Sequence, residues 1–183
     1  ERVSAGPSRI VTSIAMFYDL DDPVAFARDI RSALADDGVW YFEQSYMPTM
    51  LETNSYDTVC HEHLEFYTLR QIKWMADRVG FQIVDVELND INGGSFSVTV
   101  RKANGDNTVS PSVKRILDNE LKLGLNTLKP YREFAERVVR SKQNLLKFIA
   151  EARLAGKSLA VLGASTKGNV LLQYCGLGVN EID

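Results

Sequence analysis

The 183-residue sequence predicts an α/β fold built on an open sheet. Two observations support this prediction. Short apolar runs, typical of buried strands, alternate with segments whose apolar residues recur at helical spacing. The composition, 45% hydrophobic and 25% charged residues, is that of an ordinary globular protein. The chain is therefore long enough to bury a full core, as one domain or as two smaller units.

The first part of the chain predicts a strand–helix–strand unit. Residues 9–16 form a mostly apolar, β-rich run and are expected to be a buried strand. A helix over residues 24–34 follows an aspartate-rich turn, and Asp37-Gly38 is expected to end it. Residues 39–43 form the next strand, which completes a unit typical of open α/β sheets. Ligands of such sheets bind beyond the carboxyl ends of the strands.

The middle of the chain adds one helix and two strands. The helix is expected over residues 69–79, with Gly80 as its end. Residues 81–88 and 95–101 alternate as strands do, and Asn92-Gly93-Gly94 lies in the turn between them. That turn is either purely structural or lets a ligand approach the backbone, and the structural alternative is the simpler one.

A change in composition over residues 104–111 predicts a domain boundary, which divides the chain into residues 1–106 and 107–183. In the second part, Pro130 opens a long helical pattern that is expected to end at Gly156. The apolar segment 158–162 is then expected to be a buried strand.

A glycine-bounded loop at residues 163–169 follows this expected strand and precedes a helix. Strand, loop and helix in this order favour an anion, because backbone amides and the helix dipole point at it. The loop is neither a Walker motif nor the three-glycine dinucleotide fingerprint. A plain tight turn is the alternative, although small residues and Lys167 favour a phosphate or diphosphate.

The only two histidines, His61 and His63, flank Glu62 in a segment that also holds further carboxylates, tyrosines and the thiol of Cys60. Because the ordinary pKa of histidine lies near neutrality, this segment is a candidate acid/base site. An exposed polar loop or a pair of structural histidines is the simplest alternative. The two rings would also share one face of an extended strand and could bind one ion. A metal site is not expected, because the remaining ligands of a closed zinc site are missing and the helical metalloprotease motif needs histidines four apart.

Charge and cysteine content restrict the class of protein. A net charge of -3 argues against a dedicated nucleic-acid binder. Cys60 and Cys175 are too few and too far apart to suggest a disulfide framework. The sequence shows no signal peptide and no long apolar span, so we expect a cytoplasmic protein without a membrane partner.

Three segments in this order resemble the S-adenosylmethionine-dependent C-methyltransferases that act on nucleotide-linked deoxysugars. They are Asp21-Asp22-Pro23 with its helix, residues 56–67 with His-Glu-His, and residues 163–176 with Thr-Lys-Gly-Asn. Residues 92–96, Asn-Gly-Gly-Ser-Phe, match as well. The resemblance covers nearly the whole chain, and the His-Glu-His and Thr-Lys-Gly-Asn segments are its most specific parts.

The resemblance implies the C-terminal half of a Rossmann-like class I methyltransferase sheet, from its fourth strand onward. A helical connection and the start of a second Rossmann-like domain, which binds the nucleotide sugar, are expected to follow. The family's cysteine-rich zinc domain, glycine-rich loop and acidic strand end are not in this sequence. We therefore expect an incomplete S-adenosylmethionine site, zinc only outside this chain, and no activity from the chain alone. Asp19 and Cys60 stand where family members often carry histidine and tyrosine.

The resemblance also implies a mechanism in which a base removes a proton beside a ketone and the enolate attacks the sulfonium methyl group. His63 is the expected base, Glu62 would orient or polarise a neighbouring group, and His61 would have a structural or substrate-positioning part. The donor side is expected at Ala15, Met16 and Phe17. The substrate contacts are expected at Tyr56 and Asn92, with the diphosphate held by Thr166, Lys167 and Asn169.

Two other functions stay open from the sequence. One is a non-catalytic nucleotide-sugar binding module, and the other is a metal-dependent hydrolase that uses His61 and His63. The expected partner is a nucleotide sugar and not a nucleic acid, and the sequence does not fix the oligomeric state.

Overall fold

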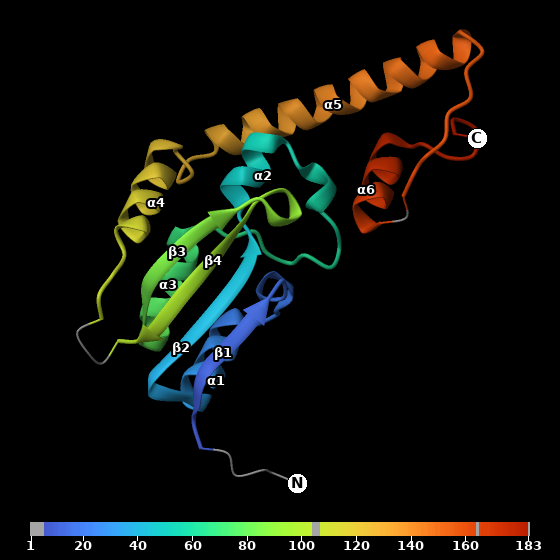
Figure 1. Ribbon diagram of the computed structural model, residues 1–183. Helices are drawn as coiled ribbons and strands as arrows, with labels where there is room; N and C mark the ends of the chain where they lie inside the picture. The colour runs from blue at the N-terminus through green and yellow to red at the C-terminus, as the bar shows by residue number, and fades with distance from the viewer. Residues whose placement is uncertain (1–5, 104–106, 164, 183) are drawn as a thin grey trace.

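The computed structural model describes residues 6–103, 107–163 and 165–182. Within them a four-stranded sheet has the strand order β1-β2-β4-β3. Helices α1 and α3 cover one face of this sheet (Figure 1). The long helix α5 extends away from the sheet, and the chain then turns back so that α6 lies beside the loops that follow α2. The elements are β1 (Ser8–Ile14), α1 (Pro23–Ala33), β2 (Leu34–Ser45), α2 (Met47–Thr53), α3 (Leu69–Val79), β3 (Phe81–Asn89), β4 (Ser95–Lys102), α4 (Pro111–Lys122), α5 (Lys129–Leu154) and α6 (Thr166–Cys175). Three short 3-10 helices are η1 (Phe17–Asp19), η2 (Tyr56–Thr58) and η3 (Ile91–Gly93).

The expected strand–helix–strand order is confirmed, but the expected burial of the first strand is wrong. β1 is an edge strand in which Ile10 is 72% and Ile14 52% exposed. β1 and β2 pair in parallel, with Val11 opposite Trp40, and α1 connects them. The side chain of Asp22 caps α1 by accepting a hydrogen bond from the amide of Ala25 at 2.8 Å. The helix expected over residues 69–79 and the two strands after it are also confirmed, although both strands run antiparallel to their neighbours.

The expected end of the first helix at Asp37-Gly38 is wrong. The helix ends at Ala33, because Leu34 takes an extended conformation, pairs with Ser8 and fills the core. Gly38 lies instead within β2, where the register with β1 shifts. A Cβ atom at Gly38 would meet the side chain of Leu34, so this glycine serves close packing within the sheet.

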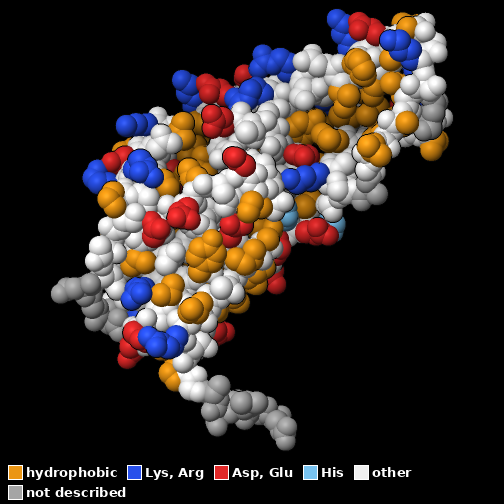
Figure 2. Space-filling model, in the orientation of Figure 1, with side chains coloured by type: hydrophobic (Ala, Val, Ile, Leu, Met, Phe, Trp, Pro, Cys, Tyr) orange, Lys and Arg blue, Asp and Glu red, His pale blue; other side chains and the backbone are white. Residues whose placement is uncertain are grey.

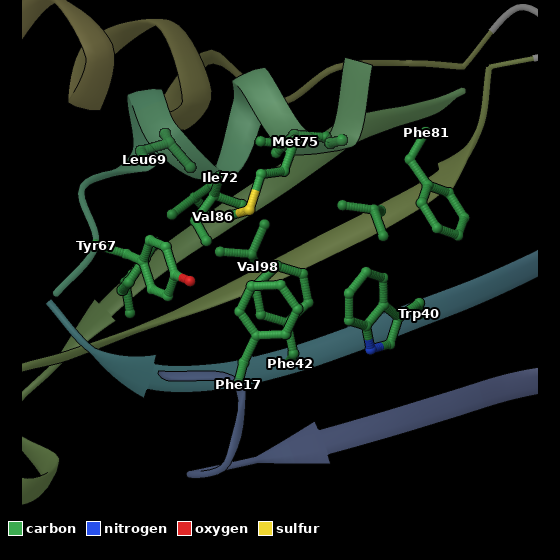
Figure 3. Packing of buried hydrophobic residues seen from close by; sticks show 14 of the residues in the cluster. Phe17, Trp40, Phe42, Tyr67, Leu69, Ile72, Met75, Phe81, Val86 and Val98 are labelled. Atoms are coloured by element: carbon green, nitrogen blue, oxygen red, sulfur yellow. The ribbon is translucent and has the colours of Figure 1, made fainter. Parts of the chain in front are cut away.

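The core lies between the sheet and its two covering helices. Figure 3 shows side chains of α3 pointing onto aromatic residues that come from β2 and from η1. Phe17 is 2% exposed and its ring centroid lies 5.3 Å from that of Phe42. The labelled members of this cluster are Phe17, Trp40, Phe42, Tyr67, Leu69, Ile72, Met75, Phe81, Val86 and Val98.

Helix α4 was not among the expected elements, and it packs against β3 and α3. Its residues Val113 and Ile116 belong to the same buried cluster as the sheet. Part of the expected domain boundary, residues 104–106, lies outside the described residues. The division into residues 1–106 and 107–183 stays a prediction.

Helix α5 is confirmed as the long helix, and with 26 residues it is about 39 Å long. The buried strand expected at residues 158–162 is wrong, since the described part of the chain forms its sheet from β1 to β4. Val161 is 50% exposed and Leu162 fully exposed. An apolar run becomes a parallel strand only where a neighbouring strand supplies hydrogen bonds. The sequence of the run itself does not show whether such a neighbour exists. In the described residues no helix is long and apolar enough to cross a membrane.

Candidate functional site

The His-Glu-His segment lies in a loop between η2 and α3, and the backbone ties it to the carboxyl end of β1. The amides of Leu64 and Glu65 both donate to the carbonyl oxygen of Tyr18, each at 3.1 Å. Tyr18 lies in η1, directly after β1. The loop is therefore held at the edge of the sheet where ligands of open α/β sheets bind.

His63 is half-buried, and two contacts fix its ring. Its centroid lies 4.5 Å from that of Tyr18 in an edge-on arrangement, and its Nδ1 lies 2.8 Å from the carbonyl oxygen of Thr58. A carbonyl oxygen only accepts hydrogen bonds, so Nδ1 carries the proton in this contact. The neutral ring then holds its lone pair on Nε2, which is the tautomer that a general base requires.

His61 and Glu62 line a cavity of about 830 Å³, which is within the usual size of small-molecule sites. The cavity lies between this loop, helix α5 and helix α6. Figure 2 shows the histidine side chains beside acidic ones at the same face, below apolar side chains that gather between α5 and the C-terminal segment. The ring of His63 packs against Tyr18, whereas His61 and Glu62, the two residues before it, face the cavity.

The two histidines have different surroundings: His61 lines the cavity, whereas the ring of His63 packs against Tyr18. Within residues 6–103, 107–163 and 165–182, no three histidine, cysteine, aspartate or glutamate side chains are grouped to hold a metal.

The groups around His63 affect one another electrostatically. Partial burial raises the pKa of Asp19, the nearby His63 acts in the opposite direction, and Glu62 raises it further. Burial also raises the pKa of Tyr18, with smaller increases from Asp19 and Cys60. Acidic, imidazole, phenol and thiol groups therefore meet at the carboxyl end of β1, although they come from two separate segments of the chain.

The three residues expected on the donor side occupy different positions. Ala15 is exposed, has a positive φ of 52°, and donates its amide to the carbonyl oxygen of Glu43 at 2.8 Å. Met16 is half-buried, and the ring of Phe17 lies in the core. The side chains of Ala15 and Met16 are therefore at least partly exposed, whereas that of Phe17 is part of the core.

Three of the five residues expected to contact substrate line this cavity, and the other two are bonded to each other. Tyr56, Thr166 and Asn169 line it. Lys167 joins the group through its Nζ atom, which donates to the carbonyl oxygen of Asn92 at 3.2 Å. This contact links residues 75 positions apart in the sequence.

The expected loop at residues 163–169 is shorter than the sequence suggested, and Ala164 lies outside the described residues. Ser165 caps α6 by accepting a hydrogen bond from the amide of Gly168 at 3.3 Å, so Thr166, Lys167 and Asn169 lie in the first turn of the helix. The amides of Gly168 and Asn169 are bonded to Ser165, so an anion would meet the first amides of the turn and the positive end of the helix dipole.

The sequence did not predict that α5 contributes to this site. Phe134, Val138 and Val139 line the cavity, as do Gln173 and Tyr174 of α6. The helical periodicity of α5 marked its apolar stripe, but no local signal in the sequence says what such a stripe faces.

Comparison with known families gives two matches. Residues 90–183 match the model of the C-methyltransferase C-terminal domain, and residues 1–86 match that of a methyltransferase domain.

Among individual proteins, the C-methyltransferase NovU of Streptomyces niveus is 33% identical over 177 residues. That alignment covers 97% of this chain and 42% of NovU, so the chain spans less than half the length of this relative. Similar solved structures include the O-methyltransferase NcsB1 from neocarzinostatin biosynthesis, with a TM-score of 0.42, 16% identity, and coverage of 53% of this chain and 29% of NcsB1. The methyltransferase CalO6 has a TM-score of 0.43, 22% identity, and coverage of 54% of this chain and 37% of CalO6.

Proposed function

This chain belongs to the C-methyltransferase family, and on that premise we propose that it forms the acceptor side of an S-adenosylmethionine-dependent enzyme. The substrate is a nucleotide-linked keto-deoxysugar that receives a methyl group on carbon. One observation carries the proposal: Nδ1 of His63 lies 2.8 Å from the carbonyl oxygen of Thr58, which leaves the lone pair of the neutral ring on Nε2, and the two residues before His63 line the cavity.

The chemistry follows from what a carbon nucleophile needs. A carbon beside a ketone becomes nucleophilic only when its proton leaves, so a base near neutral pKa must lie close to it. His63 accepts that proton on Nε2 while its Nδ1–H stays bonded to the carbonyl of Thr58, which stabilises the imidazolium. S-Adenosylmethionine, when bound, supplies an electrophilic methyl group, and the new carbon–carbon bond forms as the carbon–sulfur bond breaks with its electrons going to sulfur.

The other residues of the loop bind and orient the acceptor. Glu62 and His61 line the cavity and can hydrogen-bond to hydroxyl or carbonyl oxygens of the sugar. Tyr56 lies beside them, and its ring centroid is 5.6 Å from that of Tyr174. These side chains would hold the sugar in the cavity, beside the loop that carries His63.

The diphosphate of the nucleotide fits the first turn of α6. Lys167 provides a positive charge, Thr166 and Asn169 provide side-chain donors, and the turn provides backbone amides. On the donor side, Ala15 and Met16 can contact S-adenosylmethionine through their side chains, since Ala15 is exposed and Met16 half-buried after the end of β1.

The test is the substitution His63→Asn in the full-length protein. Its amide keeps some of the polarity and reach of imidazole, so folding and nucleotide-sugar binding should persist while the chemical rate falls by about 10² to 10⁴. Solvent deuterium should enter the acceptor carbon of the native protein without methyl donor, and the variant should lose this exchange. His61→Asn is the matched control and should cost less.

Two outcomes would contradict the proposal. Normal exchange and turnover in His63→Asn would exclude His63 as the base and leave Glu62 or Tyr56 to be tested. Tight nucleotide-sugar binding by the native protein without any exchange or methylation would identify a non-catalytic binding module.

A further inference from the structure

Helix α5 forms one complete side of the cavity. Phe134, Ala135, Val138 and Val139 line it, and their spacing places them on one face over two successive turns. None of these side chains has a group that can donate or accept a hydrogen bond. A ligand surface that lies against this side of the cavity can therefore make only apolar contacts.

The residues that face α5 are of mixed character. His61 and Glu62 of the loop and Thr166 and Asn169 of α6 carry hydrogen-bonding groups, whereas Val59 and Val170 do not. These four hydrogen-bonding side chains therefore lie opposite the apolar side chains of α5, which orients a molecule that has one polar and one apolar face.

Two polar contacts join α5 to neighbouring elements at this side of the cavity. Within the lining stretch, the guanidinium group of Arg137 donates to the carbonyl oxygen of Leu51 in α2. One turn beyond the lining residues, Nζ of Lys142 donates to the carbonyl oxygen of Tyr174 at 2.5 Å and lies 4.8 Å from the centre of its ring. These contacts connect the apolar side of the cavity to α2 and to α6.

We propose that Phe134, Val138 and Val139 determine acceptor specificity by admitting a sugar face that carries no hydroxyl group. The inference rests on the proposed function, because it takes the acceptor of that reaction as the occupant of the cavity. A hydroxyl group directed at these side chains loses its bonds to water and finds no partner. An apolar pocket typically binds a ligand that carries one added hydroxyl about tenfold to a hundredfold more weakly. We expect the same ratio of affinities here.

The experiment compares two nucleotide sugars that differ by one hydroxyl on the sugar, measured by calorimetric titration of the full-length protein. The native protein should bind the deoxygenated sugar roughly tenfold to a hundredfold more tightly. Val138→Thr keeps the shape of the side chain and adds a hydroxyl, so it should reduce this ratio by about tenfold. Val109→Thr is the matched control, since Val109 is 41% exposed before α4 and should leave the ratio unchanged.

A thermal denaturation curve for each variant verifies that it is folded, and Phe134→Tyr is a second variant that adds a hydroxyl to the same wall. An unchanged ratio in both folded variants would overturn the inference. Equal binding of the two sugars by the native protein would overturn it while leaving the proposed function intact. Failure of the native protein to bind either sugar would overturn both.

Discussion

The carboxylate of Glu120 in α4 lies 2.6 Å from the backbone nitrogen of Leu69 at the start of α3. It also accepts hydrogen bonds from the amide of Arg70 at 3.0 Å and from the hydroxyl of Tyr46 at 2.8 Å. Burial raises the pKa of Tyr46 and the charge of Glu120 raises it further, so this hydroxyl stays a donor. One buried side chain therefore caps a core helix and joins it to the end of β2.

We expect Glu120→Ala to lower the free energy of unfolding by about 1.5 to 3 kcal/mol, the range for hydrogen bonds to a charged group. The loss arises because two helix amides and one phenol are left without their acceptor. Urea denaturation followed by circular dichroism measures it. Asp118→Ala, in the same helix, removes an exposed pair with Lys114 and should cost less than about 1 kcal/mol. Equal losses in the two variants would contradict the role of Glu120.

A second prediction concerns pH and the contact between α4 and β3. Hydrogen bonds from Ser112 and Ser110 hold the pKa of Asp85 below its ordinary value. A carboxylate whose pKa is lower in the folded state stabilises the fold above the unfolded pKa of about 3.9 and loses this effect as the pH falls through its folded pKa. The free energy of unfolding of Asp85→Asn should therefore be about 1 kcal/mol lower than that of the native protein at pH 7. This difference should disappear at acidic pH.

Denaturation midpoints of both proteins between neutral and acidic pH measure this difference. Ser112→Ala removes the donor that lies 2.8 Å from the Asp85 carboxylate and should show the same closing difference. If the difference in denaturation midpoint between the native protein and Asp85→Asn stays constant down to the lowest pH, the carboxylate is not the group responsible.

The third prediction concerns Lys167. Lys167→Ala should weaken binding of a nucleoside diphosphate by roughly tenfold to a hundredfold, because a charge-assisted hydrogen bond is lost. Lys157→Ala, an exposed lysine after the end of α5, is the control and should bind as the native protein does. Calorimetry decides, and an unchanged affinity in Lys167→Ala would leave the first turn of α6 without a ligand-binding role.

The elements with strong local signals were predictable from the sequence. The helix over residues 69–79 has helical spacing and ends at Gly80, and the structure has the same bounds. The unit of β1, α1 and β2 follows from its apolar runs. The end of α1 was not predictable, because the position of Leu34 depends on a core that forms from distant segments.

The candidate site was predictable as a set of residues but not as an arrangement. The sequence marks His61, Glu62 and His63 by composition alone. It does not tell that Tyr18 holds their loop, or that α5 faces it. Both relationships are long-range contacts, and local patterns carry no information about them.

The His-Glu-His loop and helix α6 are held by different kinds of contact. The carbonyl of Tyr18 holds the loop through two backbone amides. Helix α6 contacts η3 and η2 through flexible side chains, in the bond from Lys167 to Asn92 and the ring contact between Tyr56 and Tyr174. Rotation of side chains breaks these contacts of α6, whereas release of the loop breaks backbone hydrogen bonds. The α6 side of the cavity is therefore more easily displaced than the loop side.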